Sequence, residues 1–184
     1  MKSKLLKLTF LSILTLSLMS FMIQQDWYQF QSEKFGYKVL FPTEPIKDSK
    51  IIETDIGQLE TDYTMLTDSN LEADNLVYMV VKTKYPKKEL NSNDKKIVMN
   101  FFEKAINAAI NKSNGELLSE KVITYGDYPG REIKIASQNG ITNTKMRIYL
   151  IENTSYIVET TYKKEKEFNA SSMKFMDSFE LLEE

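Results

Sequence analysis

Apolar and polar positions alternate along residues 128–162, and this alternation predicts three consecutive β-strands. Ile133 and Ile135 fall on one face of the first strand, with charged residues between them. Asn139-Gly140 follows, a dipeptide typical of tight hairpin turns because both residues tolerate positive φ angles. The pattern therefore predicts an antiparallel meander, whose apolar face needs a covering layer of helices or a second sheet.

The position of this turn also predicts which residues face each other across the first two strands. Residue 138 is expected opposite residue 141, which places Ile133 opposite Met146 and Glu132 opposite Arg147. Apolar side chains then meet apolar ones, and opposite charges pair on the polar face. Turn and alternation thus predict the same register.

Further strands and two helices are expected around this meander. Asn91 to Asp94 carries capping residues and Asn114-Gly115 a stop signal, with apolar residues between them at helical spacing. A second helix is expected from residue 163 onward, with Phe168 and Phe175 on its buried face. Shorter stretches predict strands at residues 36–42, 50–54, 58–66, 76–84, 116–125 and 178–182.

The first residues have the pattern of a secretory signal peptide. Met1 to Lys7 is positively charged, and Leu8 to Ile23 is apolar apart from serine and threonine. We therefore expect a signal peptide over residues 1–23, cleaved between residues 20 and 25, and a single domain over residues 27–184. The expected location is exported, either periplasmic or extracellular. The alternative is a membrane anchor, because no Ala-x-Ala site is present and the apolar run approaches the roughly 20 residues that span a bilayer.

Composition excludes several kinds of chemistry. The chain has 184 residues and contains no cysteine and no histidine, so disulfides, zinc-thiolate sites and catalytic triads built on imidazole cannot form. The formal net charge is −2, and loss of the lysine-rich leader would make it more negative. Nucleic acid is therefore not expected as a partner, and a membrane only through an uncleaved leader.

Three short patterns could carry chemistry, and each has a simpler structural interpretation. Ser92 and Lys95 have the S-x-x-K spacing of a serine nucleophile beside a lysine, but the same letters fit a helix start. Residues 68–74 space oxygen ligands as a calcium loop does, yet Ala73 stands where that loop has glycine, which favours a solvated acidic turn. Glycoside hydrolysis needs a pair of carboxylates. Four acids could supply such a pair, and no combination is favoured: Glu53, Asp55, Glu60 and Asp62.

The scarce arginines are the most specific candidates for contact with a ligand or partner. Arg131 lies on the same face of its strand as Ile133. An arginine on an apolar face can bind a ligand carboxylate with two hydrogen bonds, or it can pair with an acid within the protein. We mark Arg131, Arg147 and Tyr128 as possible contact residues. No catalytic residue, metal ligand or cofactor is predicted.

Four segments resemble exported bacterial domains of the PsbP-like class. They are Phe35 to Pro45, Pro129 to Lys134, Arg147 to Leu150 and Phe175 to Phe179. The resemblance spans nearly the whole chain after the leader and implies an α+β fold, an antiparallel β-sheet covered by helices in an α/β/α sandwich. Members of this class range from photosystem-associated binding proteins to a partner of a small GTPase, so no catalytic residue is implied.

These observations favour an exported, non-enzymatic binding or accessory domain, for example an assembly factor in the cell envelope. Its expected partner is another envelope protein or a small ligand. One alternative is a carboxylate-based hydrolase acting on envelope polymers, and another is a small-ligand carrier. A deep pocket with converging acids would favour the enzyme, whereas a flat apolar patch would favour a protein partner.

Overall fold

The computed structural model describes residues 26–54, 56–137 and 139–182. The predicted signal peptide, residues 1–23, lies outside the described residues and stays a prediction. Within the described ranges, no helix combines the length and the apolar composition needed to cross a bilayer.

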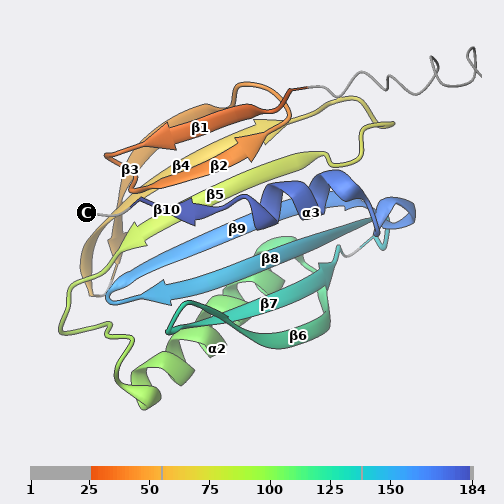
Figure 1. Cartoon of the computed structure of the whole chain (residues 1–184). Helices are drawn as coiled ribbons and strands as arrows, with labels where there is room; N and C mark the ends of the chain where they lie inside the picture. The colour runs from red at the N-terminus through yellow and green to blue at the C-terminus, as the bar shows by residue number, and fades with distance from the viewer. Residues whose placement is uncertain (1–25, 55, 138, 183–184) are drawn as a thin grey trace, which may run out of the picture.

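Seven antiparallel strands form the main sheet (Figure 1). Their spatial order is β3 (Ile46–Thr54), β4 (Gly57–Thr67), β5 (Val77–Lys84), β9 (Thr154–Lys163), β8 (Thr142–Ile151), β7 (Tyr128–Ala136) and β6 (Glu116–Tyr125). Neighbours in this order are also neighbours along the chain, except where β5 pairs with β9. That non-local pairing joins the two parts of the sheet.

The predicted register of β7 and β8 is confirmed. Ile133 lies opposite Met146 and Glu132 opposite Arg147 along the same ladder, while residue 138 lies outside the described residues. The turn between the strands closes through a hydrogen bond from the Gly140 amide to the Ser137 carbonyl, at 2.8 Å. Gly140 has a φ of 65°, a left-handed conformation that glycine adopts without steric cost.

One face of the main sheet is covered by α2 (Lys95–Ser113), which has the bounds that the capping signals predict. Asp94 Oδ1 accepts hydrogen bonds from two amides of the first turn, and Asn114, with a φ of 45°, ends the helix. The buried side chains of α2 pack on aliphatic residues of β7 and β8; they are Val98, Phe102 and Ile106.

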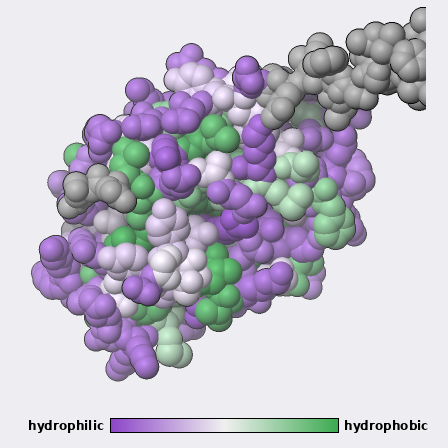
Figure 2. Space-filling model, in the orientation of Figure 1, coloured by the Kyte–Doolittle hydropathy of each residue, from purple (hydrophilic) through white to green (hydrophobic). Residues whose placement is uncertain are grey.

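The opposite face is covered by α3 (Ala170–Asp177) together with a second sheet of three strands. This small sheet consists of β1 (Tyr28–Ser32), β2 (Tyr37–Phe41) and β10 (Glu180–Leu181). The core beneath it is largely aromatic and includes Phe30, Phe35, Tyr37, Phe41, Tyr78, Tyr149, Tyr156, Phe175 and Phe179. The outer surface on the side seen in Figure 2 is mainly hydrophilic, with smaller apolar groups between. The fold is therefore an α+β sandwich, as predicted, but the strands predicted at residues 36–42 and 178–182 join a separate small sheet rather than the main one.

The second helix begins later than predicted. A single 3-10 turn, Lys164–Lys166, precedes α3, and the Asn169 side chain caps α3 by accepting a hydrogen bond from the Ser172 amide at 2.6 Å. Phe168 lies before this cap and is 93% exposed, so its predicted place on the buried face is wrong. Phe175 is buried as expected.

Candidate functional site

Several strand ends and turns meet at one end of the sandwich, on the left in Figure 1. β5 and β8 end there, β9 begins there, and the β1–β2 and β6–β7 turns lie beside them. A cleft of about 500 Å³ opens between these elements. Its charged lining consists of three lysines, Lys34, Lys82 and Lys84, and two glutamates, Glu33 and Glu152, and Tyr128 and Tyr156 lie beside them. We call it the lysine cleft.

The glycine of the β1–β2 turn leaves space for two polar groups of the cleft. Gly36 has a φ of 73°, and a Cβ at this position would lie 3.8 Å from the Tyr156 hydroxyl and 3.9 Å from the Lys82 ammonium. Lys82 and Tyr156 are also directly opposite each other in the β5–β9 ladder. The ammonium and the phenol therefore approach the same space beside Gly36.

Lys82 has no carboxylate within ion-pair distance in the described part of the chain, although Asp62 lies opposite it in the β4–β5 ladder. Its Nζ donates a hydrogen bond to the Lys34 carbonyl at 3.3 Å, and neither Lys82 nor Lys84 takes part in an ion pair among the described residues. Burial lowers the pKa of Lys82, and nearby Lys84 and Lys34 lower it further, whereas Asp62 and Glu60 oppose the shift without cancelling it. An anionic group in the cleft would compensate these positive charges.

Lys34 differs from the other two cleft lysines because a carboxylate lies close to it. Lys34 Nζ lies 3.7 Å from Asp62 Oδ1 and donates to Ser49 Oγ at 2.9 Å. Ser49 Oγ in turn donates to Asp62 at 2.6 Å. Asp62 is 4% exposed, so this acid holds the β1–β2 turn against β3 and β4.

The other acids considered for glycoside hydrolysis do not form a convergent pair in the described part of the chain. Glu53 accepts a hydrogen bond from Gln58 at 2.6 Å within its own hairpin, and Glu60 lies opposite Lys84 in the β4–β5 ladder. Asp55 lies outside the described residues. The hydrolase alternative therefore gains no support from these side chains.

Ser92 and Lys95 are not joined by any hydrogen bond in the described structure. Ser92 Oγ is buried without a hydrogen-bond partner, and Ser92 lines a neighbouring cavity of about 490 Å³ together with Tyr125 and Tyr128. Lys95 is exposed at the start of α2, and Asp94, rather than Ser92, caps the helix. The geometry is that of a helix start.

The predicted calcium-loop oxygens are engaged in local contacts. Asp68 Oδ1 accepts from the Asn70 amide at 2.8 Å, and Asn70 Oδ1 accepts from the Glu72 amide at 3.0 Å. Asp74 Oδ2 accepts from Ser171 at 2.7 Å. Within the described ranges, no group of three or more acidic side chains could hold a metal ion.

Of the three predicted contact residues, Tyr128 is the one that lies in the lysine cleft. It also lines the neighbouring cavity, so it separates the two spaces. Arg131 is engaged elsewhere: its Nε donates to Glu120 Oε1 at 3.1 Å, and its guanidinium lies 4.7 Å from the centre of the Phe102 ring. These contacts tie β6 and α2 to β7.

Arg147 joins two strands to the end of a helix. Its Nε donates to Glu132 Oε2 at 2.9 Å, and its Nη1 donates to the Met176 carbonyl at 3.0 Å and to Asp177 Oδ1 at 2.7 Å. Lys145 lies 3.3 Å from Glu132 Oε1. Burial alone would raise the pKa of Glu132, but Arg147 and Lys145 outweigh this effect and hold the pKa below its usual range.

Sequence reasoning did not single out Lys82, Lys84 or Tyr156. A signal was present, because Lys82 and Lys84 share one parity of an otherwise apolar strand. That parity alone could not place them beside Gly36, which is brought to the cleft by the small sheet.

No family model matches the sequence, and no curated protein matches it. Among solved structures, the fold is similar to the solution structure of cyanobacterial PsbP (CyanoP) from Synechocystis sp. PCC 6803, with a TM-score of 0.54. The match covers 85% of this chain and 93% of that chain, at 13% sequence identity. The chain therefore has a PsbP-like fold, which confirms the predicted resemblance. At this identity, the likeness shows the fold alone.

Proposed function

We propose that the protein is an exported, non-enzymatic binding or accessory domain, which holds an acidic segment of a partner protein of the cell envelope in the lysine cleft. The observation that carries this proposal is the pair Lys82 and Lys84. Both line the cleft, and neither forms an ion pair within the described residues. Carboxylates of a bound segment would supply the missing partners.

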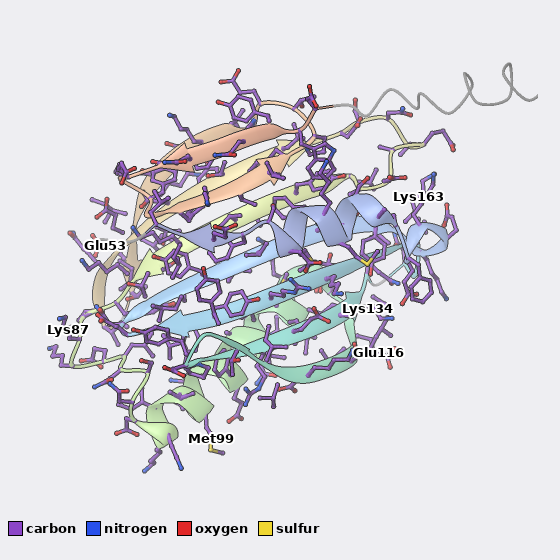
Figure 3. The ribbon with its side chains drawn as sticks, viewed as in Figure 1. Glu53, Lys87, Met99, Glu116, Lys134 and Lys163 are labelled. Carbon is purple, nitrogen blue, oxygen red and sulfur yellow. The ribbon has the colours of Figure 1, made fainter. Side chains whose placement is uncertain are left out.

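The surroundings of the cleft favour an extended segment over a compact small molecule. Small-molecule pockets are mainly apolar with few polar groups, whereas in this cleft lysine, glutamate and tyrosine side chains outnumber the aliphatic ones, which are Ile151, Leu181 and Leu182. Two further cavities adjoin it, one sharing Tyr128 and the other sharing Glu152. Lys87, labelled at the same end in Figure 3, lines the last of these. A chain of several residues could therefore follow the three spaces in turn.

The proposals of export and of an envelope partner are based on the sequence. The charged and apolar regions before residue 24 have the order of a secretory leader, and the absence of cysteine and histidine removes the commonest catalytic arrangements. A non-enzymatic role agrees with the hydrogen bonds that Glu53 accepts from Gln58 and Asp62 from Ser49, because both acids are engaged by neighbouring side chains.

The site can be mapped by adding a hexaglutamate peptide to ¹⁵N-labelled protein that was expressed with its own leader and purified. We expect amide shifts concentrated at Gly36, Lys84 and Tyr156, and their loss in the Lys82→Met variant. Lys104→Met, an exposed lysine of α2, removes the same charge elsewhere and should leave the shifts unchanged. Shifts spread evenly over the surface, or unaffected by Lys82→Met, would contradict the assignment.

Partner identity can be tested by crosslinking in the native envelope fraction. A photoreactive group at Tyr128 would lie where two cavities meet. We expect one reproducible protein partner with an acidic segment, and a lower yield when Lys82→Met is present. A yield equal to that of a photoreactive group placed at Lys104 would argue against a partner in the cleft.

A further inference from the structure

The main sheet ends in two edge strands of different character. β6 is interrupted by an irregularity between Leu117 and Ser119, and its Glu120 is paired with Arg131. Bulges and engaged charges protect an edge from pairing with another chain. β3 instead pairs with β4 in an unbroken register over nine residues, so its outer edge is regular.

Apolar side chains are exposed along this regular edge. Ile46 is 60% exposed, Ile51 68% and Ile52 47%. The Ser49 amide donates a hydrogen bond to the side chain of the preceding Asp48, at 2.8 Å, which places this amide on the open side of β3. A long edge with exposed isoleucines and an amide held only by a neighbouring side chain is suited to accept another strand.

The sequence of β3 is complementary to itself in the antiparallel direction. If two copies meet with Ser49 on a two-fold axis, Ile46 of each copy faces Ile52 of the other, and Asp48 faces Lys50. These four residues share one face of the strand. Moving the axis by one residue would bring two aspartates or two lysines face to face, which is unfavourable. Apolar and charged pairs therefore select one register.

We propose that β3 pairs with β3 of a second copy of this chain, forming a symmetric dimer with one sheet continuous across both copies. The contact is isologous, because the same residues serve on both sides. It is limited to one strand from each copy, so the dimer forms and dissociates with protein concentration. Lys34 of the lysine cleft donates to Ser49, so the two clefts come to lie near the two-fold axis.

Sedimentation of the full chain over about a hundredfold range of concentration tests the proposal. Wild-type protein should shift from monomer to dimer as concentration rises. Lys50→Asp places like charges opposite each other and should keep the protein monomeric, and the exchanged variant Asp48→Lys/Lys50→Asp should restore the dimer. A wild-type protein that stays monomeric, or a dimer that Lys50→Asp leaves intact, would overturn the proposal.

The absence of cysteine allows a second test that does not depend on charge. In the proposed register, Ser49→Cys places two cysteines opposite each other at a distance that suits a disulfide. We expect this variant to form a crosslinked dimer at least about tenfold faster than Val122→Cys, a residue of the β6 edge that is 75% exposed. Equal crosslinking rates for the two variants would show that the disulfide forms by random collision and not across a β3 interface.

Discussion

Cationic side chains gather in two regions of this molecule, and they differ in how far the protein neutralises them. Around Arg147, the positive charges meet Glu132 and Asp177. In the lysine cleft, Lys82 and Lys84 have no ion pair within the described residues. The first region, which we call the arginine clamp, serves the fold. The second leaves two lysine charges without an ion pair among the described residues, which is the basis of the proposed binding site.

The clamp matters for the fold because it connects elements that are far apart in the sequence. Arg147 on β8 reaches Glu132 on β7 and the last residues of α3. Nearby, Lys134, labelled in Figure 3, pairs with Glu167 in the segment before α3. Both contacts hold the α3 region against the face of the main sheet. In the lysine cleft, Lys82 makes one long-range connection, the hydrogen bond to the Lys34 carbonyl at 3.3 Å, and it involves no carboxylate.

The largest effect is expected when the clamp loses its central residue. Arg147→Met leaves Glu132 largely buried without its main partner, and it removes the hydrogen bonds to the end of α3. We expect the free energy of unfolding to fall by about 3 kcal/mol, measured by urea denaturation. Lys104→Met, which removes an exposed charge on α2, should change it by less than about 0.5 kcal/mol. Similar small losses in both variants would remove the distinction between the two regions.

Acid should weaken the clamp in a way that identifies Glu132. The pKa of Glu132 is lowered in the folded protein, so its stabilising contribution is present above its unfolded pKa and is lost as pH falls through the folded value. We expect the free energy of unfolding to decline below about pH 4.5. In the Glu132→Gln variant, this decline should be smaller by roughly 1 kcal/mol. An unchanged pH profile in that variant would assign the acid sensitivity to other carboxylates.

The smallest and most specific effect on stability is expected in the cleft. The pKa of Lys82 is lowered in the folded protein, which means that its positive charge is less favourable there than in the unfolded chain. Lys82→Met should therefore raise the unfolding free energy at neutral pH, by about 0.5 kcal/mol. Urea denaturation at pH 7 measures this change. A clear loss of stability would show that Lys82 has a structural role instead.

Local signals predicted the parts of the fold that depend on neighbouring residues. The register of β7 and β8 followed from alternation and from one turn, with Gly140 in the conformation that the turn needs. The bounds of α2 followed from Asp94 and Asn114, because capping groups act within one turn of a helix. Phe168 was misplaced because the Asn169 cap starts α3 after it.

The small sheet could not be predicted because it depends on contacts between the two ends of the chain. β10 contains only Glu180 and Leu181, and it pairs with Lys38 and Tyr37 of β2. Strands were predicted at residues 36–42 and 178–182, but no local signal shows that they pair with each other. The strand β1 was not among the predicted strands, and it pairs with β2 along its whole length.

The candidate site was largely missed because it too depends on contacts between distant segments. Its residues come from the β1–β2 turn, from β5 and from β9, and the β5–β9 pairing that sets Lys82 opposite Tyr156 spans the whole of α2. Of the predicted contact residues, Tyr128 reached the cleft. The arginines stood out by rarity, and the structure engages both in contacts within the protein.

The most direct test of this account is calorimetric titration of hexaglutamate into wild-type protein and two variants, one from each region. Lys82→Met should lower the affinity at least about tenfold while the protein stays fully folded. Lys134→Met, which breaks the pair with Glu167, should lower the unfolding temperature while affinity stays at the wild-type value. If Lys82→Met binds as wild type does, or if Lys134→Met weakens binding equally, the cleft is not the anion-binding site.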